Sequence, residues 1–235
     1  MNLLLSRMPG GSPEIFESIQ GEGASAGLPS TFVRLAVCNL RCSWCDTAYT
    51  WDWKRYDRAE QVVETSIEEV LGAISERAPR NVVVTGGEPL VQRLALQPLM
   101  LALRRREYRI EVETNGTIPP AGLSGLIDQW NVSPKLASSG NAGLARIRLA
   151  ALAALVAEPR AFFKFVVSGP GDLPEIESVV AFTGIRTEQV ILMPQGRTRD
   201  ELESASAWLA AECTRRGWRF STRLHILIWG DKRGI

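Results

Sequence analysis

The sequence predicts an α/β protein built on a mainly parallel β-sheet. Short runs of β-branched and apolar residues alternate with longer amphipathic stretches, the order typical of β-α-β units. Glycine or polar residues directly follow several of these runs, and ligand-binding groups lie at such strand ends in parallel sheets. No repeat, low-complexity tract or long linker interrupts the 235 residues, so one domain spanning 1–235 is expected.

Each expected element has its own local pattern. Strands are expected where β-branched or apolar residues run together, over 31–37, 81–84, 109–113, 129–132, 162–167, 190–193 and 219–227. Helices are expected where apolar residues recur at helical spacing, over 59–77, 92–106, 144–158 and 198–216, the third being ended by Pro159. These patterns alone fit an open sheet and a closed barrel equally.

Charge and composition exclude several classes of protein. The 27 basic and 26 acidic residues leave a net charge of +1, without the basic stripe typical of nucleic-acid binding. Residues 1–7 lack the features of a signal peptide, and no apolar run reaches membrane-spanning length. Free thiols gathered in one place favour a reducing compartment, so the cytoplasm is expected.

Three cysteines close together form the most informative motif. Cys38, Cys42 and Cys45 directly follow the first expected strand, and Cys213 is the only other cysteine. Three thiolates can hold three irons of a 4Fe–4S cluster and leave the fourth iron open, whereas a structural zinc site has four protein ligands. Because Cys213 fits a buried helical thiol, spacing alone leaves a reactive cluster and half of a zinc site both open.

Polar and glycine-bearing segments follow the other expected strands. They are 85–88 (Thr-Gly-Gly-Glu), 113–115 (Glu-Thr-Asn), 133–135 (Ser-Pro-Lys) and 193–196 (Met-Pro-Gln-Gly). Because the carboxyl ends of parallel strands share one edge, these segments and the cysteines are expected to surround one site. Any one of them alone could be a simple turn.

Together the motifs resemble the radical S-adenosylmethionine superfamily. The cysteine spacing, with Trp44 before the last cysteine, and the Gly-Gly-Glu turn after the next strand carry this resemblance. A narrower resemblance, to the 7-carboxy-7-deazaguanine synthases, rests on 16–23 (FESIQGEG), 45–47 (CDT), 113–116 (ETNG) and 133–135 (SPK). It begins at about residue 14, which leaves 1–13 as an expected N-terminal extension. It implies an incomplete parallel (β/α) barrel of the radical SAM type, with the cluster at its mouth.

This resemblance implies a radical lyase. Such an enzyme converts 6-carboxy-5,6,7,8-tetrahydropterin to 7-carboxy-7-deazaguanine with loss of ammonia, in the biosynthesis of queuosine and other 7-deazapurines. The implied cofactors are a 4Fe–4S cluster with three cysteine ligands, S-adenosylmethionine and Mg²⁺. The implied partners are the pterin, an electron donor such as a flavodoxin or ferredoxin, and a second copy of the chain in a homodimer. Neither a nucleic acid nor a membrane is expected as a partner.

The resemblance also implies a role for each site residue. The expected metal ligands are Cys38, Cys42 and Cys45 for the cluster and Thr47 for Mg²⁺. The residues expected to bind S-adenosylmethionine are Trp44, Cys45, Asp46, Gly87, Ser133, Pro134, Lys135, Met193 and Gln195. Those expected to bind the pterin are Ile19, Gln20, Gly21, Arg34, Thr85, Glu113 and His225, with Glu113 also the expected catalytic residue.

Several alternatives stay open. A guanidinium suits the pterin carboxylate, yet Arg34 could instead form a strand-edge salt bridge, and Thr47 could bond its own backbone. His225 has apolar neighbours and fits a core histidine as well as a substrate contact, and the role of the tail 229–235 is open. The chain could also be another radical enzyme, such as a glycyl-radical activase, or a non-catalytic zinc or electron-transfer module.

Overall fold

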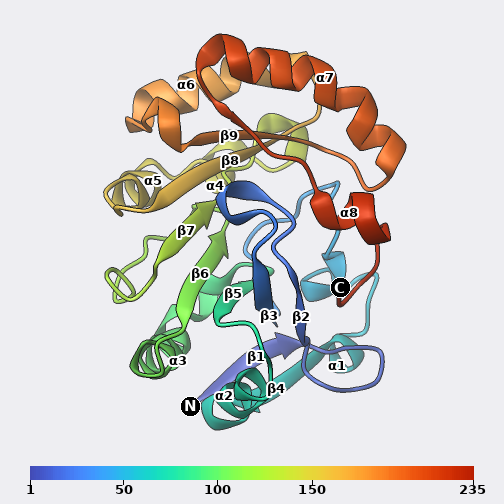
Figure 1. Ribbon diagram of the computed structural model, residues 1–235, viewed down its shortest axis with the longest axis vertical. Coiled ribbons are helices and arrows are strands. Elements are labelled where there is room, and N and C mark those ends of the chain that lie inside the picture. The colour runs from blue at the N-terminus through green and yellow to red at the C-terminus, as the bar shows by residue number, and fades with distance from the viewer.

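Ten strands form one curved sheet in the computed structural model, which describes residues 1–235 (Figure 1). The strands are β1 (Asn2–Ser6), β2 (Ile15–Ile19), β3 (Pro29–Leu35), β4 (Val62–Ser66), β5 (Asn81–Gly86), β6 (Arg109–Thr114), β7 (Gln129–Val132), β8 (Ala161–Val167), β9 (Val190–Pro194) and β10 (Arg219–Phe220). The helices are α1 (Arg58–Gln61), α2 (Ile67–Ser75), α3 (Arg93–Arg105), α4 (Gly143–Arg146), α5 (Leu149–Val156), α6 (Leu173–Thr183), α7 (Arg199–Arg216) and α8 (Leu224–Trp229). Helices α3, α5, α6 and α7 lie around the outside of the sheet (Figure 1).

The sheet is an open, mainly parallel barrel. Its strand order is β10-β9-β8-β7-β6-β5-β3-β1-β4, with β2 also paired to β3. The pairs from β3 through β5 to β10 are all parallel, whereas β1, β2 and β4 pair antiparallel. The edge strands β4 and β10 do not pair with each other. The incomplete (β/α) barrel expected from the sequence is therefore confirmed.

Most of the sequence-predicted elements are confirmed. Strands β3 and β5 to β9 and helices α3 and α7 lie where the apolar patterns predict them. Helix α7 begins after Thr198, which forms a capping box with Glu201, and ends at Gly217 in the left-handed conformation. Local start and stop signals therefore set the limits of this helix.

The single helix predicted over 59–77 is wrong. This segment contains α1, then β4, then α2. The β-branched Val62 and Val63 favour an extended backbone, and β4 pairs with β1 along its whole length. Ser66 then forms a capping box with Glu69 and starts α2. The helix predicted over 144–158 is likewise divided, into α4 and α5.

The strand predicted over 219–227 is also wrong. Only Arg219–Phe220 pair with β9, and α8 follows. The backbone N–H of Leu224 donates to the carbonyl of Gly21 at 2.8 Å, so the start of α8 is bonded to the loop after β2 and not to the sheet. His225 therefore lies on a helix. An apolar run this short does not separate helix from strand by its period.

Residues 1–13, expected as an N-terminal extension, contribute β1 to the sheet. Strand β1 lies between β3 and β4, and its Leu3 and Leu5 are fully buried. Leucines at alternate positions of a strand share one face, and here that face joins the hydrophobic core. None of the helices in the chain combines the length and hydropathy needed to cross a bilayer.

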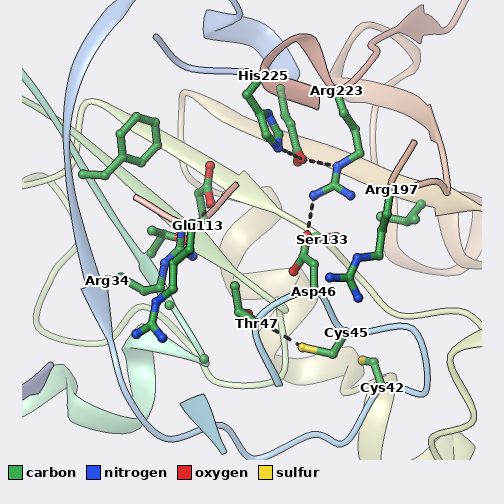
Figure 2. A pocket seen from close by; sticks show the side chains of 18 of the residues that line it. Arg34, Cys42, Cys45, Asp46, Thr47, Glu113, Ser133, Arg197, Arg223 and His225 are labelled. Atoms are coloured by element: carbon green, nitrogen blue, oxygen red, sulfur yellow. Dashed lines mark hydrogen bonds and ion pairs between the residues drawn. The ribbon is translucent and has the colours of Figure 1, made fainter. Parts of the chain in front are cut away.

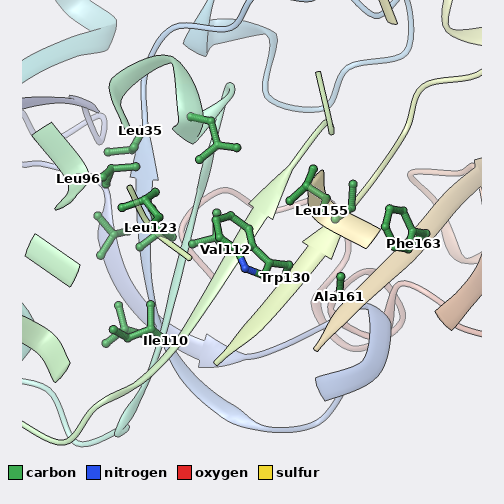
Figure 3. Close-up of a cluster of buried hydrophobic side chains, with 14 of the residues drawn as sticks. Leu35, Leu96, Ile110, Val112, Leu123, Trp130, Leu155, Ala161 and Phe163 are labelled. Carbon is green, nitrogen blue, oxygen red and sulfur yellow. The ribbon is translucent and has the colours of Figure 1, made fainter. Parts of the chain in front are cut away.

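The two faces of the parallel strands carry different side chains. On β6, Ile110 and Val112 join the hydrophobic core, which also contains Trp130 of β7 (Figure 3). Glu111 and Glu113 alternate with them and so point to the opposite face, the inside of the barrel. The interior of the barrel is therefore polar, and a site for polar ligands can form at its mouth.

Replacing Leu5 tests whether β1 is part of the core. Leu5→Ala should lower the free energy of unfolding by about 2–5 kcal/mol, because it leaves a cavity in a packed interior. Leu144→Ala is the control, since Leu144 is 89% exposed and its loss should change stability by less than about 0.5 kcal/mol. Equal effects in denaturant unfolding would mean that β1 does not pack as described.

Candidate active site

A cavity of about 440 Å³ opens at the carboxyl ends of the parallel strands (Figure 2). Its lining comes from the loops after β2, β3, β5, β6, β7 and β9, from β8 and from α8 and the C-terminal tail. Every site residue predicted from the sequence lines it except Pro134, which lies between the lining residues Ser133 and Lys135. The structure thus brings together segments that are far apart in the chain.

The three thiols of the cysteine loop line this cavity and each accepts an N–H. The bonds are Leu40 N to Cys38 Sγ at 3.4 Å, Asn141 Nδ2 to Cys42 Sγ at 3.3 Å and Trp51 Nε1 to Cys45 Sγ at 3.3 Å. Such donors stabilise negative charge on sulfur and are among the groups that tune iron–sulfur clusters. The donor set therefore fits a cluster held by three thiolates.

Burial keeps Cys38 and Cys42 protonated until a metal replaces the proton. Burial raises the pKa of Cys38 to about 12, and it also raises that of Cys42, which nearby Lys135 opposes. Metal binding must displace a proton from each ligating thiol. No three His, Cys, Asp or Glu side chains in the chain are gathered to hold a single ion.

Two glycines let β5 pack against the base of the cysteine loop. Gly86 has a φ of +134° and Gly87 follows it. A Cβ on Gly86 would overlap the backbone of Leu35 at the end of β3, and a Cβ on Gly87 would overlap the backbone of Val37 at the start of the loop. The Gly87 N–H donates to the Leu35 carbonyl at 3.0 Å. The Gly-Gly turn therefore has a structural reason in addition to any contact with a ligand.

Glu88, the third residue of this turn, anchors the next strand end. It is fully buried, and burial raises its pKa. Its carboxyl group accepts the N–H of Leu90 at 2.9 Å, the hydroxyl of Thr114 at 2.8 Å and the N–H of Asn115 at 2.6 Å. These bonds fix the end of β6, and with it Glu113, relative to β5.

Two predicted pterin-binding residues donate hydrogen bonds to a third, Glu113. Gln20 Nε2 donates to Glu113 Oε1 at 3.0 Å, and Thr85 Oγ1 donates to Glu113 Oε2 at 2.7 Å. Each residue comes from a different strand end. Because each carboxylate oxygen can accept more than one hydrogen bond, Glu113 keeps capacity to accept N–H groups of a ligand.

An ion-pair network that the sequence analysis missed borders the same cavity. Glu22 pairs with Lys164 of β8 and with Arg223. Arg223 also pairs with Asp46 (Figure 2). Burial raises the pKa of Glu22, but Lys164, Arg223 and His225 outweigh burial and hold the pKa well below its usual range. For Asp46 burial is likewise outweighed, chiefly by Arg223, and its pKa is lowered. Lys164 is the only charged residue within the apolar run 161–167. This is the sequence feature that could have indicated the network.

His225 of α8 lies against this network and against Gly21. Its Nε2 is 4.0 Å from Glu22 Oε1, and a Cβ on Gly21 would overlap its ring. Burial lowers the pKa of His225, and Arg223 acts in the same direction while Glu22 opposes them. His225 therefore favours the neutral form. Because it lines the cavity, the alternative that it is a residue of the hydrophobic core is excluded.

The residues predicted to bind S-adenosylmethionine lie near the cysteine loop and at the ends of β7 and β9. Lys135 Nζ donates to Ser133 Oγ at 2.8 Å and lies 5.6 Å from the centroid of the Trp44 ring. Met193 and Gln195 line the cavity at the end of β9. These groups offer an apolar surface, a cation and polar atoms along one side of the cavity.

The open barrel with a three-cysteine loop at its mouth defines the radical SAM class, and comparison supports this. Residues 33–136 match the radical SAM superfamily, which implies a 4Fe–4S cluster and S-adenosylmethionine. The chain is 41% identical to the 7-carboxy-7-deazaguanine synthase of Pyrobaculum aerophilum, over 94% of this chain and 95% of that protein. It is also 41% identical to the 7-carboxy-7-deazaguanine synthase of Halobacterium salinarum, over 93% and 90%.

The chain therefore belongs to the 7-carboxy-7-deazaguanine synthase family, whose members are radical SAM lyases. The crystal structure of QueE from Escherichia coli has the same fold, with a TM-score of 0.67 and 24% identity over 96% of this chain and 95% of that one. The family membership decides against the activase and the zinc or electron-transfer module that the sequence left open.

Replacing Gly21 tests the contact between the loop after β2 and α8. Gly21→Ala should displace His225, because the added Cβ overlaps its ring, and should move its pKa upward toward the ordinary value. His225 is the only histidine, so its NMR signal is unambiguous in a pH titration. Gly72→Ala is the control, because a Cβ there meets nothing within 4 Å. An unchanged titration in Gly21→Ala would contradict the described packing.

Proposed function

We propose that this chain converts 6-carboxy-5,6,7,8-tetrahydropterin to 7-carboxy-7-deazaguanine and ammonia, in the biosynthesis of queuosine or another 7-deazapurine. The observation that carries the proposal is that the three-cysteine loop and the group around Glu113 line one cavity. The family membership supports the same reaction. The atoms balance, since loss of one ammonia accounts for the whole difference between substrate and product.

Cys38, Cys42 and Cys45 would hold three irons of the cluster, and the other cavity residues would position the reactants. When bound, the cluster and S-adenosylmethionine supply the radical that removes a hydrogen atom from the pterin. The protein binds, orients and shields the reactants. Lys135, Ser133 and Trp44 border the side of the cavity nearest the cysteine loop, which supports their assignment to S-adenosylmethionine.

The pterin would lie between Arg34 and Glu113. Arg34 uses only its Nε within the chain, in a bond to Glu14, so both Nη groups remain for the pterin carboxylate. Glu113 would accept N–H groups of the pterin ring and is the proposed catalytic residue, held by Gln20 and Thr85. Ile19, Gly21 and His225 complete this side of the cavity.

Mg²⁺ would bind between Thr47 and the pterin carboxylate. Thr47 Oγ1 lies 3.7 Å from Cys45 Sγ and lines the cavity (Figure 2). Mg²⁺ prefers oxygen ligands and keeps several bound waters. One hydroxyl of the protein and one oxygen of the substrate are therefore sufficient as its remaining ligands.

The proposal includes a cytoplasmic homodimer reduced by a flavodoxin or ferredoxin. Three clustered free thiols favour a reducing compartment. Leu94 and Leu101 project from the outer face of α3 and are exposed, which leaves apolar surface for a second copy of the chain. The cluster chemistry needs an external one-electron donor. That donor would have to dock near the mouth of the cavity.

Anaerobically purified protein tests the enzyme activity directly. With 6-carboxy-5,6,7,8-tetrahydropterin, S-adenosylmethionine, Mg²⁺ and a reductant, it should form 7-carboxy-7-deazaguanine, and it should contain about four irons per chain. Cys42→Ala should lose both the iron and the product, because a cluster ligand is removed. Cys213→Ala should keep both, since Cys213 packs behind β10 in the core. Absence of product from iron-loaded wild-type protein would refute the proposal.

Replacing Thr47 tests the magnesium site. Thr47→Ala should lower turnover about 10-fold or more and weaken its dependence on Mg²⁺, because an oxygen ligand is lost. Thr47→Ser keeps the oxygen and should lose much less. Iron content should stay unchanged in both variants. Equal losses in both would mean that the γ-methyl group matters through packing and that Thr47 is not a ligand.

A further inference from the structure

Glu14 is a buried carboxylate that the proposed chemistry does not yet use. It lies just before β2, and its side chain is fully buried. Its Oε1 accepts Arg34 Nε at 2.8 Å and the Tyr49 hydroxyl at 3.1 Å, and its Oε2 accepts Arg233 Nε at 2.9 Å. A buried charge is tolerated only with such partners, so Glu14 fixes three side chains from three separate segments.

The bond to Glu14 sets the direction of the Arg34 guanidinium. Only Nε of Arg34 is bonded to the protein, and Arg34 lines the cavity. The guanidinium also lies 5.8 Å from the centroid of the Phe16 ring. Because the guanidinium is planar, holding it at Nε directs the two Nη groups together, in the arrangement that a carboxylate accepts.

The C-terminal tail supplies the other partner of Glu14. The guanidinium of Arg233 lies 3.6 Å from the centroid of the Tyr49 ring and donates to Gln61 and to the carbonyl of Arg7. A Cβ on the next residue, Gly234, would overlap Met8, so the tail fits closely against the segment between β1 and β2. Residues 231–235 line the same cavity as Arg34.

The charges around Glu14 leave an excess of positive charge beside the cavity. One carboxylate faces two guanidiniums, of Arg34 and Arg233, each with a side chain less than one quarter exposed. Burial lowers the pKa of Arg34, but Tyr49, Glu14 and Asp46 outweigh it and raise the pKa, so the guanidinium stays charged. This group of four residues therefore attracts an anion into the cavity.

We propose that Glu14 is a positioning residue for the substrate carboxylate. It holds Arg34 in the orientation that binds the carboxylate, and Arg233 makes this orientation depend on the tail being seated. The inference rests on the proposed function, because it takes the pterin as the ligand of Arg34. It gives the tail 229–235, whose role the sequence left open, a part in substrate recognition.

A double-mutant cycle on the anaerobic holoenzyme tests this inference, with Kd for the pterin and for S-adenosylmethionine measured in each variant. Arg34→Ala should weaken pterin binding about 10- to 150-fold. Arg233→Ala should weaken it about 3- to 10-fold. In the Arg34→Ala background, Arg233→Ala should add less than about 2-fold, because its effect passes through Arg34. S-adenosylmethionine binding and iron content should not change.

Further variants separate positioning from a general loss of structure. Glu14→Gln should raise KM for the pterin more than it lowers kcat; if it does not fold, the Arg233 cycle still decides. Arg233→Lys keeps the charge without the fork and should fall between wild type and Arg233→Ala. Arg186→Ala is the control, since it removes only an exposed ion pair with Glu188, and should leave both affinities unchanged.

The outcomes distinguish this inference from the proposed function. Additive losses in the cycle, or equal losses of pterin and S-adenosylmethionine affinity, would overturn the role of Glu14 while the reaction stands. A wild-type protein that does not bind the pterin overturns both. Coupled losses confined to the pterin support the inference.

Discussion

The ion pairs centred on Glu22 and Arg223 are the interaction on which the site depends. An incomplete barrel has no hydrogen bonds between its two edges, and here β4 and β10 remain unpaired. Glu22 connects the loop after β2 to Lys164 on β8, and Arg223 connects the segment before α8 to Asp46 in the cysteine loop. Charged side chains thus connect, across the mouth of the barrel, segments that the hydrogen bonds of the sheet do not join.

Such ion pairs fix the positions of the segments that carry them more than they stabilise the fold. Removing charges from water costs free energy that their mutual attraction often only offsets. A network of this kind is therefore weak evidence for a stable fold. It does require each partner to be in place, because one missing partner leaves a buried charge unpaired. In this protein that requirement ties the cysteine loop, β8 and α8 to a single arrangement around the cavity.

The same principle extends to the opposite wall of the cavity. Glu14 joins β3, the segment after the cysteines and the C-terminal tail, and Glu88 joins the ends of β5 and β6. In each case one buried carboxylate collects donors from segments distant in sequence. In this protein, buried acids therefore hold the ligand-binding groups in place, while the glycines at 86 and 87 let the backbones approach.

The sequence by itself determined the parallel strands β3 and β5 to β9, the helices α3 and α7, and a set of site residues of which all but Pro134 line the cavity. The strands and helices follow from local patterns, namely apolar runs and capping residues, whereas the site residues follow from the family resemblance of the motifs at the strand ends. It did not determine β4, α8 or the place of β1, because short segments take the structure that their partners impose. Nor did it reveal the roles of Glu14, Lys164 and Arg223. Their function depends on which distant charges lie opposite them, and only the tertiary structure decides that pairing.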